Sequence, residues 1–495
     1  MNAFNYTVSE YLRNFINGEF VDSNSKERFE FLNPSNNKIL GTIPAGSEKD
    51  VDMAVKAARK AFESWRNMSM SKRSEMLHEV ARLIRKYKEE LARIETLNVG
   101  IPISQTRSQV ERAAENFDFF ADMLTKLSEE VYVDDDKFIN YVIRSPIGVA
   151  GLITPWNTPL MLETWKIAPC LAAGDTCVFK PAEWTPMSAN KLAEIMQEAG
   201  IPAGVFNIVH GIGELSGAAL VAHPYVRLIS FTGETVTGME IMRNGASTLK
   251  RFSMELGGKN PAIIFADADL KRALDAVIFM AYSLNGERCT ANSRVLIEES
   301  VYDEFLSMLA ERVEKIRIGD PFDERTELGP LVRPEHWQRV KNYIDIGIKE
   351  GAKLLYGGDR PKGFDEGNYL SPTLFADGNS EMKIFKEEIF GPVLLAMKFK
   401  NEEEAISLAN DVVYGLTAYI WTKDVERANR LAQAIEAGMI WINSHNVRDL
   451  RTPFGGAKYS GIGREGGKYS FDFYMETKTV QVALGRHKIP TFGVI

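Results

Sequence analysis

The opening third of the chain repeats apolar residues at helical spacing. Three stretches show this pattern, within residues 50–67, 76–94 and 109–127. In each of them apolar residues recur three and four positions apart, so they gather on one face of a helix. Such a face must be covered by other regions of the protein. The pattern therefore predicts three helices that pack against a larger body.

From residue 147 onward the pattern alternates between short β-rich runs and helical stretches. The β-rich runs span residues 149–153, 176–179, 205–209, 228–231 and 262–265. Between the second and the third run, Thr185 and Pro186 predict the start of a helix and Gly200 predicts its end. Strand and helix in repeated alternation indicate a parallel sheet wound with helices. The ligands of such sheets bind at the carboxyl ends of the strands.

A second α/β stretch runs from about residue 270 to residue 442. It contains further β-rich runs, such as residues 293–297 and 393–396. No low-complexity linker and no short-period repeat interrupts the sequence. We therefore predict an α/β protein with two doubly wound, Rossmann-like domains.

Composition narrows the classes of function. The 495 residues are 45% hydrophobic and 25% charged, which is typical of a soluble globular protein. The net charge of −8 argues against a nucleic-acid partner, because phosphate binding requires clustered Lys and Arg. The first residues lack the basic and apolar stretches of a secretory signal, and no window is apolar for long enough to span a bilayer. These features predict a cytoplasmic protein with no membrane partner.

The cysteines and histidines argue against a disulfide framework and against a metal site. Cys170, Cys177 and Cys289 form an odd set without CxxC spacing, and the six histidines include no HExxH pair. We expect reduced thiols and no metal. Cys170 and Cys177 lie in apolar sequence and are expected to be structural. Cys289 lies among polar and small residues, and we expect Arg288 and a following helix to lower its pKa, as a nucleophile requires.

Glycine-rich loops follow several of the predicted strands. Residues 213–217 and 233–238 place glycines ahead of predicted helices, where free backbone N–H groups and the helix dipole favour a phosphate. Neither loop matches GxGxxG, and one such loop alone is more often a tight turn. Two in succession, with Lys180 and Glu183 at the end of a neighbouring strand, favour a nucleotide. A carboxylate at Glu183 would accept from ribose hydroxyls and repel a 2′-phosphate, which favours NAD over NADP.

Seven motifs, in order along the chain, resemble those of the NAD(P)-dependent aldehyde dehydrogenase superfamily. They are Pro155-Trp-Asn157, Lys180-Pro-Ala-Glu183, Phe231-Thr-Gly233, Glu255-Leu-Gly-Gly258, Gly286-Glu-Arg-Cys289, Glu388-Ile-Phe-Gly-Pro392 and Pro453-Phe-Gly-Gly456. The resemblance covers essentially the whole chain at the family's spacing. It implies the aldehyde dehydrogenase fold and the oxidation of an aldehyde to a carboxylic acid with a nicotinamide cofactor.

The resemblance also implies roles for individual residues. Cys289 resembles the nucleophile, Glu255 the general base and Asn157 the oxyanion donor of the family. Hydride leaves the aldehyde carbon only after a thiolate has made that carbon tetrahedral, and the base then activates the water that hydrolyses the thioester. The implied cofactor contacts are Ile153, Thr154, Pro155, Trp156, Lys180, Ala182, Glu183, Gly213, Gly217, Phe231, Thr232, Gly233, Thr237, Leu256, Gly257, Glu388 and Phe390.

A division of the chain into domains follows from the same resemblance. The cofactor-binding domain would comprise residues 1–127, as a helical first segment, together with residues 147–258. The catalytic domain would comprise residues 259–446 and would be followed by a substrate-path loop at residues 447–470. The family's small β oligomerisation arm and the tail would comprise residues 128–146 and 471–495. A homodimer or homotetramer is therefore expected.

One residue departs from the family's pattern. The position after Phe231-Thr-Gly233 is small and polar in many relatives, where it faces the pyrophosphate, whereas it is Glu234 here. A carboxylate at this position would oppose a diphosphate unless it points away. Glu234 is therefore left out of the predicted contacts.

Two arginines are candidates for binding the substrate. Arg112 shares a helical face with Phe119, opposite the apolar stripe, and guanidinium groups fit carboxylates well. The alternative is that these arginines are solvated or ion-paired, as most are. Residues 447–456 resemble the branch of the family that oxidises muconate-type semialdehydes, where arginines at the positions of Arg112 and Arg451 bind the substrate carboxylate.

The remaining substrate contacts are implied by the family. Met161, Trp165 and Phe454 would line the path to the nucleophile, whereas Arg448 is interpreted as solvated or internally paired. A broad aliphatic, aromatic or betaine-aldehyde specificity stays open as an alternative. A non-catalytic protein of the same fold is a second alternative, against which the intact Cys289, Glu255 and Asn157 argue.

Overall fold

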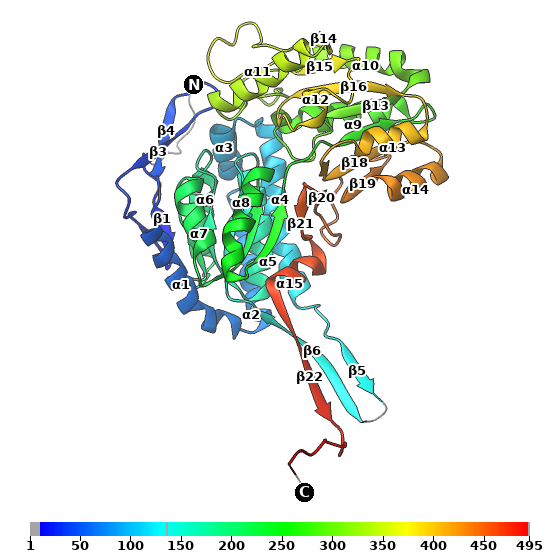
Figure 1. Ribbon diagram of the computed structural model, residues 1–495. Coiled ribbons are helices and arrows are strands. Elements are labelled where there is room, and N and C mark those ends of the chain that lie inside the picture. Colours follow the sequence, from blue (N-terminus) through cyan, green and yellow to red (C-terminus); the bar gives the residue numbers. More distant parts are fainter. Residues whose placement is uncertain (1–9, 135–136, 494–495) are drawn as a thin grey trace.

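The computed structural model describes residues 10–134 and 137–493. Within these ranges a pair of large sheets lie one above the other, with a narrow arm below them (Figure 1). Residues 1–9, on which the argument against a secretion signal rests, lie outside the described residues. Residues 135–136 and 494–495, which belong to the predicted arm and tail, lie outside them as well.

The lower sheet is an eight-stranded sheet whose centre is parallel. Strands β9, β8, β7, β10 and β11 run parallel, whereas β1 and β21 join the two sides antiparallel. The order across the sheet is β2 (Glu19–Val21), β1 (Asn14–Ile16), β9 (Phe206–Ile208), β8 (Thr176–Lys180), β7 (Val149–Ile153), β10 (Val226–Thr232), β11 (Arg251–Glu255) and β21 (Gly461–Ile462).

Helices cover both faces of this sheet, and they differ from the predicted set in one place. The stretch predicted as one helix within residues 76–94 is two helices, which break at Tyr87 because its backbone (φ −97°, ψ 18°) leaves the helical region. The helices are α1 (Glu48–Arg66), α2 (Met70–Lys86), α3 (Lys88–Val99), α4 (Ile103–Leu124), α5 (Pro159–Ala173), α6 (Met187–Glu198), the π-helical turn η1 (Gly213–Gly217), α7 (Ala218–Ala222), α8 (Thr235–Gly245), the 3₁₀ turn η2 (Ala246–Thr248) and α15 (Gly467–Tyr474).

The sequence pattern missed the strands of the N-terminal region. The region predicted as purely helical also contains β1, β2 and the hairpin of β3 (Arg28–Leu32) with β4 (Ile39–Pro44). β1 and β2 are only three residues long each, too short to show a period. Thr185 also differs from expectation, because its hydroxyl donates to the carbonyl of Trp156 and Pro186 precedes α6 instead.

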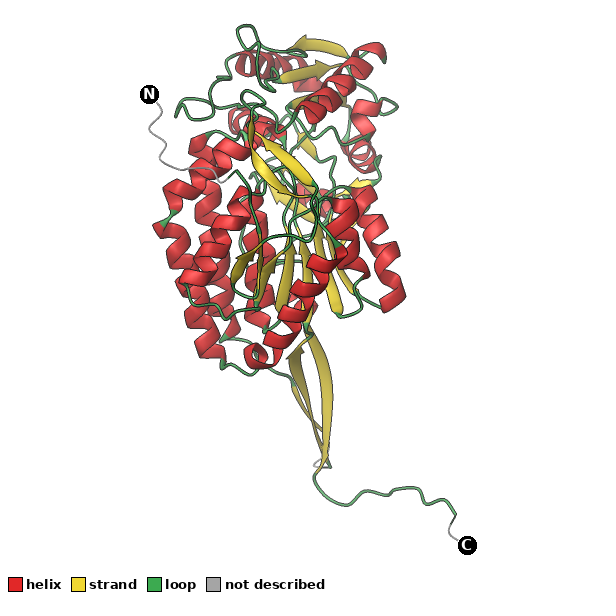
Figure 2. Cartoon of the chain, turned by 90° about the vertical axis from the view of Figure 1, so that its left-hand side faces the viewer, coloured by secondary structure: helices red, strands yellow, loops and turns green. Residues whose placement is uncertain are grey.

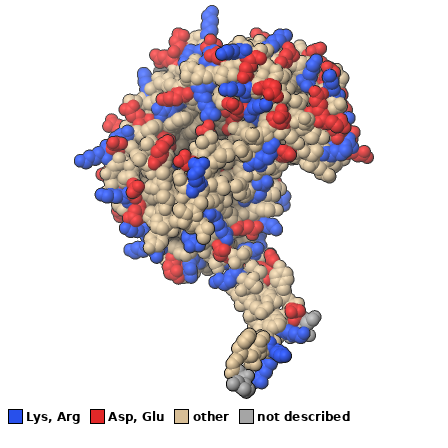
Figure 3. Space-filling view, viewed as in Figure 1, with Lys and Arg blue, Asp and Glu red and all other residues tan. Residues whose placement is uncertain are grey.

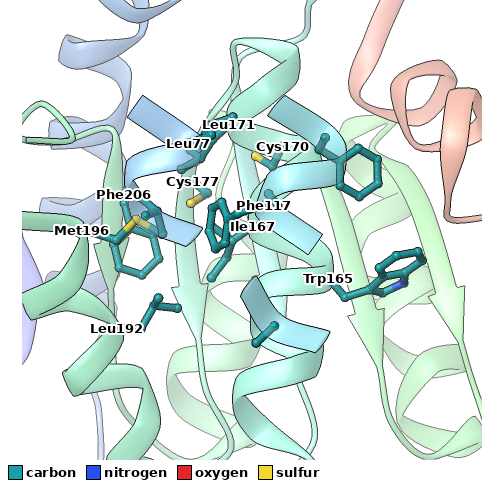
Figure 4. Packing of buried hydrophobic residues seen from close by; sticks show 14 of the residues in the cluster. Leu77, Phe117, Trp165, Ile167, Cys170, Leu171, Cys177, Leu192, Met196 and Phe206 are labelled. Atoms are coloured by element: carbon teal, nitrogen blue, oxygen red, sulfur yellow. The ribbon is translucent and has the colours of Figure 1, made fainter. Parts of the chain in front are cut away.

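The core of the lower domain lies where α2, α4, α5 and α6 meet the sheet (Figure 4). Cys170 of α5 and Cys177 of β8 are fully buried within it, as predicted for structural thiols. Labelled neighbours in the same cluster are Leu77, Phe117, Trp165, Ile167, Leu171, Leu192, Met196 and Phe206. This packing fixes α5, whose N-terminus follows the predicted oxyanion donor.

The upper sheet has seven strands and is parallel except for β14. Its order is β14 (Lys353–Tyr356), β15 (Thr373–Ala376), β16 (Val393–Phe399), β13 (Arg294–Glu298), β12 (Pro261–Ile264), β18 (Thr417–Trp421) and β19 (Met439–Ile442). Its helices are α9 (Leu270–Tyr282), η3 (Ser283–Gly286), η4 (Glu299–Val301), α10 (Tyr302–Glu314), α11 (Pro334–Lys349), α12 (Lys383–Lys386), α13 (Glu402–Asn410) and α14 (Val425–Ala434). A separate pair links β17 (Tyr414–Gly415) to β20 (Ala457–Lys458).

The arm is a three-stranded antiparallel sheet that projects from the body (Figure 2). Its strands are β5 (Val131–Asp134), β6 (Phe138–Pro146) and β22 (Met475–Ala483), which bring together the two segments predicted for it. Val131 and Val133 are more than half exposed, and the arm presents long uncharged stretches in Figure 3, whereas charges of both signs cover the body. Among the described residues, no helix has the length and apolarity needed to cross a membrane.

Candidate active site

The predicted catalytic residues meet where the two large domains join. Glu255 is the last residue of β11, and residues 256–260 carry the chain from the lower sheet to the upper one. Asn157 follows β7, and Cys289 lies in the loop between α9 and β13. All three residues line one narrow cavity. The topology therefore brings together side chains that lie far apart in the sequence.

The loop before Cys289 has an unusual backbone. Leu284, Asn285 and Gly286 all have positive φ angles, of 54°, 58° and 71°. The Asn285 side chain holds this conformation, because its amide donates to the carbonyls of Gly100 and Pro330 at 3.1 and 3.0 Å. A Cβ atom at Gly286 would lie 2.4 Å from the carbonyl carbon of Gly391, so only glycine fits. The thiol is thus held on a locked backbone.

The surroundings of Cys289 correct one expectation from the sequence. No helix follows the cysteine: a turn leads directly into β13. Burial raises the pKa of the thiol to about 12, and the carboxylates of Glu388 and Glu255 act in the same direction. Arg288 and Arg448 offset this rise only partly. The thiol is therefore protonated at neutral pH in this state, and a base must take its proton before it can attack.

Asn157 is positioned to donate a hydrogen bond into the cavity. Its Nδ2 donates at 2.8 Å to the carbonyl of Glu287, two residues before Cys289. A primary amide has two N–H groups, so one of them remains available for an oxyanion. The side chain is buried, and the loop that carries it leads into α5.

Glu255 lies in a buried pocket with a second carboxylate and a lysine. Neither carboxylate oxygen of Glu255 has a hydrogen-bond partner in the described residues, and burial and then Glu465 raise its pKa well above the ordinary value. Lys166 donates to Glu465 at 2.8 Å and to Ser230 at 2.9 Å. A carboxyl group with a raised pKa and no fixed partner is a stronger base than an ordinary glutamate, as a general base requires.

The glycines after Phe454 allow the chain to pass close to Glu255. Gly455 has a φ of 158°, and a Cβ atom there would lie 2.7 Å from the Glu255 carboxylate. Phe454 and Glu465 exchange both backbone hydrogen bonds, at 2.7 and 2.8 Å. This bridge places Phe454 and Glu465 in the lining of the cavity that also contains Glu255.

A long groove at the carboxyl ends of β7, β8 and β10 leads to the same junction. Its outer section has a volume of about 480 Å³ and its inner section, which reaches Cys289, about 230 Å³. The outer section is lined by the predicted residues Ile153, Thr154, Pro155, Trp156, Lys180, Ala182, Glu183, Gly213, Gly217, Phe231, Thr232, Gly233 and Thr237. The inner section is lined by Leu256, Gly257, Glu388 and Phe390.

The donors of the groove fit a dinucleotide. Lys180 and Glu183 pair at 2.9 Å, and Lys180 lowers the pKa of Glu183 although burial opposes this, so the side chain can accept from ribose hydroxyls as a carboxylate. The hydroxyls of Thr154 and Thr232 are buried without hydrogen-bond partners in the described residues. The backbone N–H groups of the two glycine turns could bind a diphosphate. The free hydroxyls and the Glu183 carboxylate could bind its two riboses.

The residues at the inner end of the groove are tightly packed around the Glu388 carboxylate and the Phe390 ring. Glu388 accepts a hydrogen bond from the backbone N–H of Gly258 at 2.9 Å, and burial raises its pKa to about 7. A Cβ atom at Gly257 would lie 2.3 Å from the Glu388 carboxylate, which explains the glycine. Phe390 has a positive φ of 61° and contacts the ring of Trp156 edge to face at 5.3 Å.

Glu234, which departs from the family pattern, lines both sections of the groove and is paired there with a cation. Its carboxylate pairs with Arg339 of α11 at 3.2 Å, and both side chains are about half exposed. Arg339 also donates to the carbonyl of Glu388 at 3.3 Å. A cation from the upper domain therefore offsets the charge of Glu234.

Two connected chambers lie on the other side of Cys289 from the groove. The inner chamber has a volume of about 60 Å³ and is lined by Cys289, Glu255 and the predicted substrate residues Arg112, Met161, Trp165 and Phe454. The outer chamber is larger, about 530 Å³. Arg112, Arg288 and Arg448 line both chambers.

The two arginines of the C-terminal loop have exchanged the places that the sequence assigned to them. The Arg451 side chain is 80% exposed and pairs with Asp449 at 2.6 Å, outside the lining of either chamber. Arg448 lines both chambers, and its guanidinium lies 4.0 Å above the ring of Phe454 and 4.6 Å above that of Trp165. The expectation that Arg451 faces the substrate path is not met.

A turn explains the exchange. The Asp449 carboxylate accepts from the backbone N–H of Arg451 at 3.0 Å, and the Asp449 carbonyl accepts from Thr452. This Asx turn reverses the chain, so that Arg448 before it points inward and Arg451 within it points outward. Aspartate favours such a turn, but the residue type alone does not say which of the two arginines the turn directs inward.

Sequence reasoning also missed Lys166 and Glu465. The two residues are 299 positions apart, and each lies in sequence that gives little warning of a buried pair. Lys166 is a lone cation inside the apolar stretch of α5, where a fully buried lysine requires a partner. That is the one signal by which it could have been found.

Comparison with known proteins agrees with this geometry. The model of the aldehyde dehydrogenase family matches residues 20–480. The chain is 48% identical over 465 residues to the 5-carboxymethyl-2-hydroxymuconate semialdehyde dehydrogenase of Escherichia coli, covering 93% of this chain and 98% of the relative. It is 43% identical over 483 residues to the 2-hydroxymuconic semialdehyde dehydrogenase of Pseudomonas sp. (strain CF600), covering 96% and 99%.

A solved structure extends the likeness to three dimensions. The crystal structure of betaine aldehyde dehydrogenase from Staphylococcus aureus in complex with NAD+ superposes with a TM-score of 0.94 at 37% identity. The match covers 97% of this chain and 96% of that chain. Relatives that are named for different aldehydes thus share the fold, so the substrate has to be argued from the chambers.

Proposed function

Because the chain belongs to the aldehyde dehydrogenase family, we propose that it oxidises a carboxylated, muconate-type semialdehyde to the acid, with NAD as the oxidant. The observation that carries this proposal is Arg448. It is a guanidinium that lines both substrate chambers and has no hydrogen bond or ion pair in the described residues. A carboxylate is the ligand that such a group fits best.

We assign the chemistry to the three residues at the domain junction. Cys289 attacks the aldehyde carbon after Glu255 has taken the thiol proton, and the second N–H of Asn157 stabilises the oxyanion. NAD supplies the acceptor for the hydride that leaves the carbon. After Glu255 has released the thiol proton to solvent, it takes a proton from the water that hydrolyses the thioester and releases the acid. Glu465 raises the pKa of the Glu255 carboxyl, and Lys166, which is paired with Glu465, partly offsets that rise.

The preference for NAD over NADP rests on Glu183. Its carboxylate lies on the groove wall beside Lys180, where it would accept from the hydroxyls of a ribose. A 2′-phosphate at that ribose would meet the negative charge. We place the enzyme in the cytoplasm, as a homodimer or homotetramer that assembles through the arm of β5, β6 and β22.

The main alternative is a broad or betaine-type specificity, because one similar solved structure is that of a betaine aldehyde dehydrogenase. The substrate chambers argue against a cationic aldehyde. Arg112, Arg288 and Arg448 all face the space that such a substrate would enter, and like charges in a buried site repel strongly. A neutral aldehyde would leave the three guanidiniums without a counterion.

The test compares two arginine variants that differ in position by three residues. Arg448→Met is expected to lower kcat/KM for 2-hydroxymuconate semialdehyde by about 100-fold, the loss expected for a charge-assisted carboxylate contact. For a neutral aldehyde of similar size the loss should be severalfold at most. Arg451→Met removes the same charge from the exposed side of the turn and should change neither rate by more than about twofold.

The outcomes separate the alternatives. Equal losses for the charged and the neutral aldehyde with Arg448→Met would reject the carboxylate role. A large loss with Arg451→Met would mean that the loop binds substrate in a different conformation. A wild-type enzyme that oxidises the neutral aldehyde as well as the carboxylated one would support the broad specificity.

A further inference from the structure

We propose that Arg288 is a second carboxylate anchor, so that the site selects semialdehydes with two carboxylates over those with one. This inference rests on the proposed function, which requires one carboxylate on the substrate, and extends it to a second carboxylate. Arg112 and Arg448 then bind one carboxylate, and Arg288 binds the other. The carboxylates lie in the outer chamber and the aldehyde enters the inner one.

The first observation is the charge of the outer chamber. Three guanidiniums line it, from Arg112, Arg288 and Arg448, and Glu115 is the one acid among its lining residues in the described chain. None of the three arginines forms an ion pair with a carboxylate of the described residues, unlike Arg85. A single carboxylate would leave positive charges in excess, whereas a dianion balances them.

The mutual effect of these charges supports the same conclusion. Burial lowers the pKa of Arg112 to about 9, and the charges of Arg448 and Arg288 act in the same direction. Three cations held this close repel one another, and an anion that bridges them removes the repulsion. Each carboxylate of a doubly charged substrate would reduce the repulsion among the guanidiniums.

Arg288 is built as an anchor. It is more than nine-tenths buried, and its guanidinium is oriented by two hydroxyls: Nη1 donates to Ser283 at 2.8 Å and Nε donates to Thr290 at 3.3 Å. A guanidinium has five N–H donors, so three of them have no hydrogen-bond partner among the described residues, and Arg288 lines both chambers. Fixing the fork in advance lowers the entropy that a bound carboxylate would otherwise cost.

The sizes of the two chambers agree with this division. The inner chamber of about 60 Å³ contains Cys289 and Glu255 and admits only the aldehyde end of a substrate. The outer chamber of about 530 Å³ has room for a branched chain. Arg288 lines both, next in sequence to the nucleophile, so a carboxylate near the aldehyde end of a branched substrate lies within its reach.

The experiment uses two substrates that differ in a carboxymethyl branch, which carries the second carboxylate. These are 5-carboxymethyl-2-hydroxymuconate semialdehyde, which has two carboxylates, and 2-hydroxymuconate semialdehyde, which has one. We expect Arg288→Met to lower the ratio of their kcat/KM values by about tenfold or more. Arg288→Lys, which keeps the charge without the fork, should restore some of the ratio.

The ratio separates a specificity role from a role in the reactivity of the thiol. Arg288 also affects the pKa of Cys289, so Arg288→Met will slow both substrates. That loss is common to both and cancels in the ratio, and the alkylation rate of Cys289 by iodoacetamide measures it independently. An unchanged ratio in Arg288→Met would overturn the proposal and leave Arg288 as a support of the nucleophile loop.

The outcomes also distinguish this inference from the proposed function. If Arg448→Met abolishes the preference for carboxylated substrates while Arg288→Met leaves the ratio intact, only the second anchor is wrong. If the wild-type enzyme oxidises a neutral aldehyde of equal size as fast as either semialdehyde, the proposed function itself fails. An analogue with an amide in place of the second carboxylate provides an isosteric check, and it should behave like the singly charged substrate.

Discussion

The cofactor groove and the substrate chambers meet at Cys289, yet they are built in different ways. The groove is made by strand ends, glycine turns and backbone groups of a doubly wound sheet, and the residues predicted for it from sequence motifs line it. The chambers are made mainly by side chains from the helices α4 and α5 and from two irregular loops, and there one arginine was misplaced. The residues that line a groove made of strand ends can be predicted from sequence motifs, because the topology of the sheet sets the position of those ends. The direction of a side chain in an irregular loop cannot be predicted in this way.

The largest expected effect lies at the residue that the two regions share. Cys289→Ser should lower the rate of NADH formation by at least about 10³-fold, because a hydroxyl loses its proton far less readily than a thiol and is a weaker nucleophile. NAD binding should persist, because most of the groove is unchanged, and quenching of the fluorescence of Trp156 and Trp184 would measure it. A rate near that of the wild type would remove Cys289 from the mechanism.

The next effect separates the two chemical steps on the chamber side. Glu255→Gln should slow hydrolysis of the thioester by roughly 10²- to 10⁴-fold. Because Glu255 also takes the thiol proton, rapid mixing should show no burst of NADH, and a burst of about one NADH per site would assign that proton to another base. Burial raises the pKa of Glu255 above its ordinary value, so its basic form becomes more populated as pH rises.

The steady-state rate of the wild type should therefore increase with pH through the raised pKa of Glu255. The variant should lose that limb of the profile, since glutamine does not titrate. A full steady-state rate without a burst in Glu255→Gln would show that another group activates the water.

On the groove side the expected effect is one of selectivity. Glu183→Gln keeps a hydrogen-bond acceptor but removes the charge, so the ratio of kcat/KM for NADP to that for NAD should rise about tenfold. Lys180 would then stand without its partner and favour the 2′-phosphate. A ratio that does not move would mean that the discrimination is steric.

The smallest effect concerns the pair that bridges the groove. Arg339→Met leaves the Glu234 carboxylate without its partner beside the groove, and the KM for NAD should rise roughly two- to fivefold, as expected for a half-exposed charge. Glu234→Gln should change it little. The double variant should regain most of the affinity, and a loss as large as in Arg339→Met would show that Arg339 contacts the cofactor directly.

Much of the fold could be predicted, and the failures have identifiable causes. The β-rich runs after residue 147 became β7, β8, β9, β10 and β12, because fully buried parallel strands are continuous apolar runs. The strands β1 and β2 escaped because three residues carry no period. The break at Tyr87 escaped because the apolar stripe continues across it. Local patterns report what faces the core, and they do not report where a helix bends.

The sequence by itself determined the class of fold, the family and the residues that line the groove, because those depend on residue types at fixed distances from strand ends. Only the tertiary structure decided which arginine faces the substrate. Arg448 and Arg451 are alike in sequence, and a hydrogen bond from a backbone N–H to Asp449 sends one inward and the other into water. The pairing of Lys166 with Glu465 was likewise decided by folding, because no local rule connects residues 299 positions apart.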